Sequence, residues 1–155
     1  MTNPVLAAFG RPFRLGIIGG APPSMIGPVH RVAAAMDQRF ALVAGVLSSR
    51  PERSRAEGMA IGLPEDRCYG SLAELIARER ARADGIEALA IITPNDSHTE
   101  YLTLALSAGL DVMMEKPLCN DLGEARVLRD LVSSTGCAGS IPHTFSGFPM
   151  RRAMR

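Results

Sequence analysis

Apolar residues along the chain fall into two alternating patterns. Continuous apolar runs predict buried strands over residues 13–18, 40–47, 86–92, 110–114 and 138–143. Apolar residues at helical spacing predict helices over residues 28–39, 50–61, 97–108 and 121–134, one more from Ser71, and the start of another at 149–155. Strands that are apolar on both faces and alternate with helices are typical of a covered parallel sheet. We therefore predict an α/β fold with a doubly wound, Rossmann-like parallel sheet.

Shorter signals mark the ends of these elements. Ser71 and Glu74 have the spacing of a capping box, and Gly109 stands where a glycine after a helix is expected. A short extended piece is expected near Cys68, within the loop 62–70. These signals add detail to the sheet without changing its class.

The length of 155 residues fits one domain, which we place at residues 13–143 after an arm at 1–12. Seventeen basic and sixteen acidic residues give a net charge of +1, which argues against nucleic-acid binding. No apolar run reaches the ~18 residues of a membrane span, and the N-terminus lacks the basic region of a signal peptide. The three cysteines are widely spaced, so we expect a cytoplasmic protein with no metal site and no disulfide.

Doubly wound sheets bind ligands at the carboxyl ends of their strands, so the loops that follow the strands are the candidate ligand site. The loop after the first strand contains Gly19, Gly20, Ala21, Ser24, Ile26 and Gly27. Gly19 suits a tight turn and Gly27 a close helix–strand contact, as dinucleotide phosphates require. The glycine spacing is not the strict one, and Pro22 and Pro23 remove two backbone donors. An ordinary glycine-rich turn is the alternative.

The loop after the second strand contains Ser48, Ser49, Arg50 and Arg53. An acidic residue here usually binds the ribose hydroxyls of NAD, whereas an arginine accommodates the 2′-phosphate of NADP. Hydroxyl and guanidinium groups suit a phosphate monoester, so NADP is favoured over NAD. The alternative is a helix capped by Ser49 beside a solvated arginine.

The loops after the third and fourth strands hold Thr93-Pro94-Asn95, His98 and Glu115-Lys116-Pro117. Asn95 or Ser97 is expected to cap the next helix, and an isolated His98 is more often structural than catalytic. Lys116 is the only lysine of the chain and stands at the end of a strand. There it can hydrogen-bond a substrate hydroxyl and help to move its proton, and partial burial would lower the pKa of its ammonium.

These loops, in this order, resemble the Gfo/Idh/MocA family of NAD(P)-dependent oxidoreductases from about Arg14 to the C-terminus. The most specific elements are Glu115-Lys116-Pro117 and Thr93-Pro94-Asn95-x-x-His98. The resemblance implies that Lys116 is the active-site lysine beside the nicotinamide. It also implies that the other residues of both motifs bind the cofactor and that residues 19–27 hold its pyrophosphate.

The chain departs from the family pattern in two respects. Ala21 stands where the family normally has glycine. Residues 144–155 look like the crossing into the second α/β domain of the family, which supplies most of the substrate pocket, and we expect that domain to be absent. We therefore expect the nucleotide-binding part of an oxidoreductase acting on a hydroxyl or carbonyl carbon of a sugar, a polyol or a related small molecule. We expect weak cofactor binding, incomplete catalysis and self-association through exposed apolar surface.

Two other functions remain open from the sequence. One is a stand-alone NADP-binding or interaction module, or an inactive remnant of an enzyme. The other is a methyltransferase that uses S-adenosylmethionine, which would favour an acidic residue at the end of the second strand. Ser48-Ser49-Arg50 offers none, so this function ranks below the others.

Overall fold

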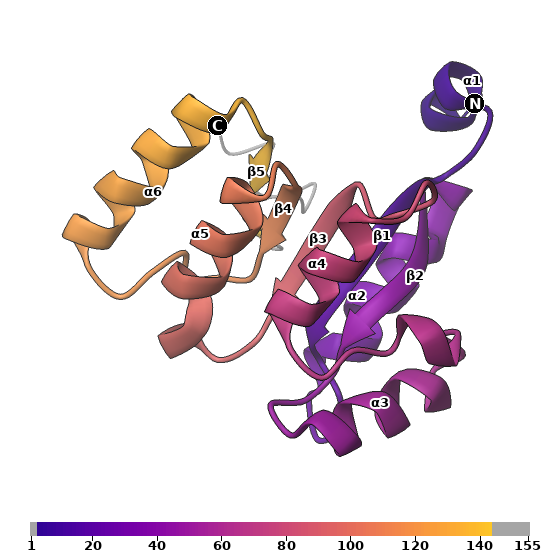
Figure 1. The fold of residues 1–155 in the computed structure, drawn as a ribbon. Coiled ribbons are helices and arrows are strands. Elements are labelled where there is room, and N and C mark those ends of the chain that lie inside the picture. Colours follow the sequence, from indigo (N-terminus) through magenta and orange to yellow (C-terminus); the bar gives the residue numbers. More distant parts are fainter. Residues whose placement is uncertain (1–2, 144–155) are drawn as a thin grey trace, which may run out of the picture.

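A computed structural model describes residues 3–143, and a five-stranded parallel sheet lies at its centre (Figure 1). The strands run in the spatial order β2-β1-β3-β4-β5. Their bounds are β1 Phe13–Gly19, β2 Phe40–Val46, β3 Ala88–Ile92, β4 Asp111–Met114 and β5 Gly139–Ser140. The predicted doubly wound parallel sheet is therefore confirmed.

Helices cover both faces of the sheet (Figure 1). The α-helices are α1 Pro4–Phe9, α2 Ile26–Ala35, α3 Pro51–Ala60, α4 Leu72–Arg80, α5 His98–Ser107 and α6 Leu122–Thr135. Short 3-10 helices follow at η1 Met36–Gln38, η2 Glu65–Arg67 and η3 Asn95–Ser97. One core packs α4, α5 and α6 against the sheet, and a smaller core lies on the side of α2 and α3. Each strand is apolar on both faces because both are covered.

The chain changes direction in the sheet between β1 and β3. β2 pairs with one edge of β1, and β3 pairs with the opposite edge of β1. Beyond β2, Cys68 makes a single parallel bridge with Gly45, which confirms the short extended piece expected there. The carboxyl ends of β1 and β3 therefore form the switch point at which such folds bind ligands.

Several local predictions differ from the structure. The expected loose arm contains α1, because the Asn3 side chain accepts hydrogen bonds from the backbone amides of Val5 and Leu6. The helix expected to reach residue 39 ends at Ala35, since Asp37 has a positive φ of 59°. β5 is two residues long, shorter than expected. The helix expected at 149–155 lies outside the described residues.

Glu87 joins the N-terminal segment to the sheet. Arg11 donates to both of its carboxylate oxygens at 2.7 and 2.8 Å, and the backbone amide of Arg14 donates at 2.9 Å. These contacts, the Arg11 hydrogen bonds first, lower the pKa of Glu87 from 4.5 to about 2. Because the pKa of Glu87 is lower in the folded than in the unfolded chain, its carboxylate stabilises the fold above pH 4.5. This contribution to the free energy of unfolding is lost as the pH falls toward 2.

We expect Glu87→Gln to lower the free energy of unfolding by about 2 kcal/mol at pH 7, after allowance for the partial exposure of Arg11. The difference between variant and wild type should shrink between pH 4.5 and pH 2, because the wild-type carboxylate is protonated over that range. Urea denaturation at several pH values measures it. A difference that does not vary with pH would contradict the assignment.

Candidate functional site

A cleft of about 870 Å³ lies at the carboxyl ends of β1, β2 and β3. Ten of the residues predicted to bind the cofactor line it, and these are Gly19, Gly20, Ala21, Ser24, Ile26, Ser48, Ser49, Arg53, Thr93 and Pro94. Loops from different strands thus meet at the switch point, although they lie far apart along the chain. The volume is within the range of pockets for small ligands and cofactors.

The glycine-rich loop after β1 has little room for side chains. Gly19 has a φ of +84°, and a Cβ there would lie 2.6 Å from the carbonyl oxygen of Ile92. A Cβ on Gly27, in the first turn of α2, would lie 2.0 Å from the carbonyl oxygen of Gly20. Both positions therefore require glycine, one for the turn and one for the contact between helix and loop. Gly27 does not line the cleft but contacts Gly20, which does.

Ser24 and two arginines hold this loop in place. The Ser24 hydroxyl accepts a hydrogen bond from the Gly27 amide at 3.2 Å, within the first turn of α2. Arg31 donates to the carbonyl oxygen of Gly20 at 3.1 Å, and Arg53 donates to that of Pro22. The peptide bond between Pro22 and Pro23 is cis. The amino end of α2, where a helix dipole favours an anion, thus faces a fixed loop.

The end of β2 presents hydroxyls and one arginine to the cleft. Ser48 accepts a hydrogen bond from the Arg50 amide at 3.2 Å. Arg50, and not Ser49, is the N-cap residue of α3, so the alternative in which Ser49 caps this helix is wrong. Arg50 is exposed and outside the lining of the cleft, whereas Arg53 is part of it and also contacts Glu57 at 3.3 Å. Arg53 is therefore the guanidinium group that the structure brings into the cleft.

The loop after β3 is held by the Ser97 hydroxyl, which lies 2.8 Å from the Thr93 hydroxyl and 2.7 Å from the Pro94 carbonyl oxygen. Ser97 is the N-cap residue of α5 but makes no capping bond, so the expected cap by Asn95 or Ser97 is not formed. Asn95 begins the 3-10 turn and is exposed outside the lining of the cleft.

His98 lies below the cleft rather than in it. Its side chain is fully buried, with Nδ1 2.7 Å from the carbonyl oxygen of Pro117 and Nε2 2.9 Å from that of Thr93. Both ring nitrogens are thus occupied by backbone groups. This arrangement is that of a structural histidine, the role favoured for an isolated His98 in the sequence, whereas the family resemblance implies contact with the cofactor.

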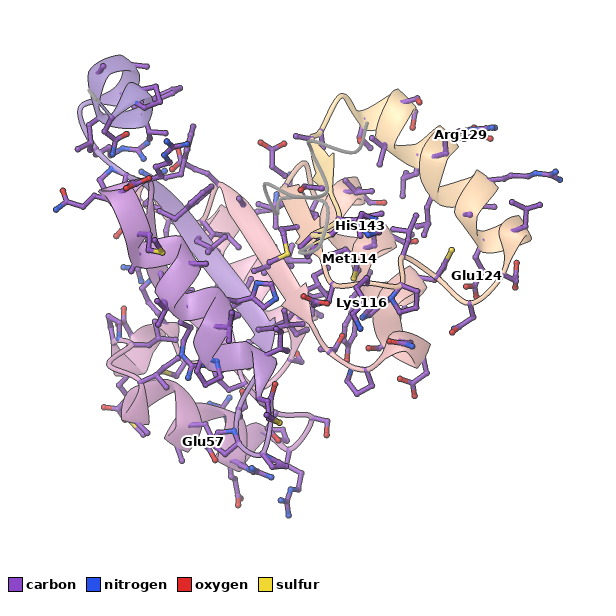
Figure 2. The ribbon with its side chains drawn as sticks, turned by 180° about the vertical axis from the view of Figure 1, so that it is seen from behind. Glu57, Met114, Lys116, Glu124, Arg129 and His143 are labelled. Carbon is purple, nitrogen blue, oxygen red and sulfur yellow. The ribbon has the colours of Figure 1, made fainter. Side chains whose placement is uncertain are left out.

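Lys116 follows β4, the neighbour of β3, and Figure 2 shows it near Met114, the last residue of that strand. Its side chain is exposed and forms no ion pair within residues 3–143, so the condition of partial burial named in the sequence analysis is not met. Glu115 accepts a hydrogen bond from the Lys116 amide at 3.0 Å. The peptide bond between Lys116 and Pro117 is cis.

Sequence reasoning missed one wall of the cleft. It consists of Gly70, Ser71, Leu72 and Ala73, which follow the extended piece at Cys68. The Ser71 hydroxyl accepts from the Glu74 amide at 3.1 Å, which confirms half of the capping box, but the Glu74 carboxylate binds the Gly70 amide instead. The hydrogen bond from the Gly70 amide is the main reason why the pKa of Glu74 is lowered. The Cys68 strand signal could have located this wall, because its carboxyl end faces the same way.

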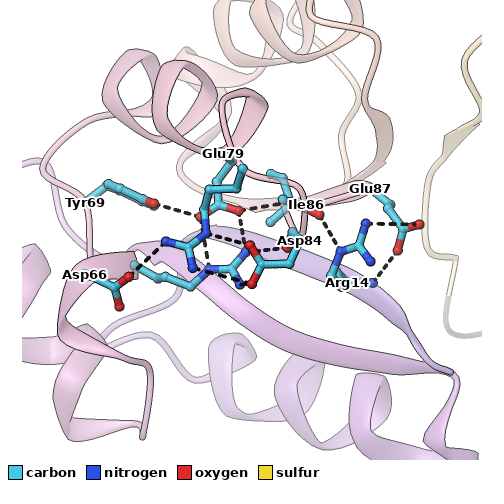
Figure 3. Close-up of polar contacts among 10 residues, drawn as sticks. Arg14, Asp66, Tyr69, Glu79, Asp84, Ile86 and Glu87 are labelled. Carbon is cyan, nitrogen blue, oxygen red and sulfur yellow. Dashed lines mark hydrogen bonds and ion pairs between the residues drawn. The ribbon is translucent and has the colours of Figure 1, made fainter.

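A buried polar cluster fixes this wall from behind (Figure 3). Glu79 accepts hydrogen bonds from Arg67, from the Tyr69 hydroxyl at 2.7 Å and from the Ile86 amide at 3.0 Å. Burial, and then the Glu79 carboxylate, raise the pKa of Tyr69. The backbone that leads into Gly70 is therefore anchored at Tyr69.

Within residues 3–143, no cluster of three or more His, Cys, Asp or Glu side chains could hold a metal ion. No helix in the same range is long and apolar enough to cross a membrane.

Comparison with protein families gives a match over residues 13–143 to a model of the oxidoreductase family with an NAD-binding Rossmann fold, named GFO_IDH_MocA. Among curated proteins, the oxidoreductase YfiI of Bacillus subtilis is 36% identical over 146 residues. The match covers 94% of this chain and 37% of YfiI. The chain thus spans little more than a third of that relative.

Solved structures of related proteins contain different coenzymes. An inositol dehydrogenase homolog from Azotobacter vinelandii, complexed with NADH and myo-inositol, has a TM-score of 0.86 and 40% identity over 88% of this chain and 36% of its own. A 3-ketoreductase from Actinomadura kijaniata, in complex with NADP, has a TM-score of 0.75 and 26% identity. Its match covers 93% of this chain and 42% of the reductase. Relatives therefore include complexes with either coenzyme.

Proposed function

The chain belongs to the Gfo/Idh/MocA oxidoreductase family with an NAD-binding Rossmann fold, and on that basis we propose that its cleft binds a nicotinamide dinucleotide for hydride transfer. The observation that carries the proposal is the pair Gly20 and Gly27, whose backbones approach so closely that no Cβ fits between them. That approach leaves room for a pyrophosphate at the amino end of α2.

The residues present fit such a cofactor. The loop 19–27 and the positive end of the α2 dipole suit the pyrophosphate, which is an anion. Ser48, Ser49 and Arg53 would hold the adenosine ribose and any phosphate on it, and the wall at residues 70–73 would cover the adenine. Thr93 and Pro94 would contact the nicotinamide half, with Asn95, Glu115 and Pro117 around it.

In this proposal the bound cofactor supplies a carbon that accepts or donates a hydride, and the chain supplies binding and proton transfer. Lys116 lies at the end of β4 with an exposed ammonium and no ion-pair partner within residues 3–143. It can donate a hydrogen bond to the oxygen of a substrate hydroxyl or carbonyl. That contact would help a proton leave or reach the oxygen while the adjacent carbon changes oxidation state.

We propose NADP as the preferred coenzyme, because the end of β2 carries hydroxyls and arginines and no carboxylate. Arg53 belongs to the lining of the cleft, and Arg50 lies outside it three residues earlier; we expect both to approach a 2′-phosphate. We expect isothermal titration to give a lower Kd for NADP⁺ than for NAD⁺, and Arg53→Ala to remove most of the difference. Equal Kd values would contradict the preference, and no binding of either coenzyme would contradict the proposed function. The chain would then be better described as an interaction module or an inactive remnant.

The substrate class we propose is a sugar, a polyol or a related small molecule with a secondary hydroxyl or a carbonyl. Support comes from the relative that was crystallised with NADH and myo-inositol. The chain covers 36% of that relative, so we expect the chain by itself to bind coenzyme weakly and to show little turnover. Its three free cysteines fit the reducing conditions of a cytoplasmic location.

We also propose self-association through the face of the sheet beside α2. A groove of about 480 Å³ lies there between α2 and β4, with a predominantly apolar lining that includes Leu15, Ala90 and Met113. Val32 on α2 and Met36, the first residue of η1, are each 63% exposed. The lining contains Arg31 on α2 and Asp111 at the start of β4, so two copies related by a twofold axis can pair these opposite charges.

We expect a dimer by size-exclusion chromatography with light scattering, and a monomer for Val32→Glu, because a charge would be placed in the contact. Val127→Glu is the matched control, since Val127 is 62% exposed on α6, which packs on the other face. It should leave the dimer intact. A monomeric wild type at the highest measurable concentration would refute this surface.

A further inference from the structure

Two histidines contact the neighbours of Lys116 in the chain, one the side chain of Glu115 and the other the backbone of Pro117. His30, on α2, lies with Nε2 2.7 Å from Oε1 of Glu115. His98, on α5, lies with Nδ1 2.7 Å from the carbonyl oxygen of Pro117. α2 and α5 pack on opposite faces of the sheet. The lysine loop is therefore held from both sides at the residues immediately before and after Lys116.

The contact with Glu115 reaches the lysine backbone directly. Oε1 of the Glu115 carboxylate binds His30, and Oε2 accepts the hydrogen bond from the Lys116 amide at 3.0 Å. The Glu115 amide in turn donates to the carbonyl oxygen of Ile91 on β3 at 2.9 Å. The side chains of His30 and Glu115 are each only 14% exposed, so water replaces neither partner easily. The two oxygens of one carboxylate thus connect His30 to the Lys116 amide.

The Lys116 side chain itself has no such support within residues 3–143. A free lysine side chain has about 2 kcal/mol of rotamer entropy, so its placement depends on where the backbone starts it. His30 also lies on the helix whose first turn closes the glycine-rich loop, one residue before the Arg31 that binds Gly20. One short helix therefore fixes both the proposed phosphate site and the lysine loop.

We propose that His30 is a positioning residue that acts through Glu115 to set the backbone conformation at Lys116. The inference rests on the proposed function only in assigning Lys116 to the nicotinamide end of the cofactor. The hydrogen bond needs a donor at the position of Nε2, and a neutral imidazole supplies it as well as a charged one. Glutamine can place an amide donor near that position, whereas asparagine is one methylene too short.

The first test needs no cofactor. Backbone ¹⁵N relaxation gives the order parameter of the Lys116 amide in wild type, His30→Gln, His30→Asn and His30→Ala. We expect about 0.85 in wild type and His30→Gln, and a fall toward 0.6 in the other two variants. Val29→Ala, at the preceding and exposed position of α2, should match wild type. A rigid Lys116 amide in the asparagine and alanine variants would overturn the proposal.

The second test separates positioning of the lysine loop from general loosening of the cleft. Titration with NADP⁺ is compared with titration with 2′-phospho-ADP-ribose, which lacks the nicotinamide. We expect His30→Asn to raise the Kd of NADP⁺ about tenfold and to leave that of the truncated ligand within about twofold. Glutamine should restore wild-type binding of NADP⁺. Equal losses for both ligands would overturn the proposal.

The two tests also separate this inference from the proposed function. If the wild type binds neither ligand, the proposed function fails, and the relaxation comparison alone decides whether His30 positions Lys116. If NADP⁺ binds and the relaxation pattern is absent, the coenzyme site stands and the role of His30 falls.

Discussion

Replacing Gly27 by alanine is expected to raise the Kd for coenzyme at least a hundredfold and to lower the free energy of unfolding by about 3 kcal/mol. The added Cβ would lie 2.0 Å from the Gly20 carbonyl oxygen and 2.7 Å from both the carbonyl carbon and Cα of Gly20. All three are backbone atoms, so no side chain can move aside to accommodate it. α2 must then shift away from the glycine-rich loop, and the proposed pyrophosphate site opens.

Gly123 provides a matched control because it is the second residue of α6, as Gly27 is of α2. It is exposed, and a Cβ there would meet only the Asp121 side chain at 3.0 Å. Gly123→Ala should change stability by less than about 1 kcal/mol, the usual range of helix propensity. Titration and guanidinium denaturation measure both effects. Coenzyme affinity within a few-fold of wild type in Gly27→Ala would remove the main support for the cofactor site.

Breaking the buried cluster at Glu79 should have the largest effect on stability. The side chains of Arg67 and Glu79 are 7% and 1% exposed. Arg67 compensates the buried charge of Glu79, and Arg67 itself also contacts Asp84 at 3.3 Å. Glu79→Ala would also leave the Tyr69 hydroxyl and the Ile86 amide without their acceptor. We expect a loss of about 3–5 kcal/mol in the free energy of unfolding.

Tyr69→Phe is the appropriate comparison for the Glu79 variant, since it removes one hydrogen bond and no charge. It should cost about 1 kcal/mol by urea denaturation. Coenzyme binding should weaken in any Glu79→Ala protein that remains folded, because Tyr69 leads directly into the Gly70 wall of the cleft. Losses of similar size in the two variants would show that the ion pair contributes little.

Sequence reasoning located most of the cleft because strand ends can be identified from apolar runs. Gly19, Ser48 and Thr93 each follow such a run, and parallel strands bring their carboxyl ends to one edge of the sheet. The wall at residues 70–73 was missed because the extended piece expected at Cys68 makes only a single bridge and was not counted among the strands whose carboxyl ends carry ligand sites. Family resemblance did not distinguish residues at the cleft surface from those beneath it, as His98 illustrates.

The sequence by itself determined the order of strands and helices, the parallel sheet and the loops that can hold a ligand, because these depend on local periodicity and on glycines that no other residue can replace. Only the tertiary structure decided which polar groups meet. His30 and Glu115 are 85 residues apart, and Arg67 meets Glu79 across a turn and a helix. Such pairs leave no local pattern, since a hydrogen bond depends on distance and direction in space. The fold could therefore be predicted along the chain. The contacts that hold the loop of Lys116 could not, because they form only when folding brings His30 on α2 to Glu115 after β4.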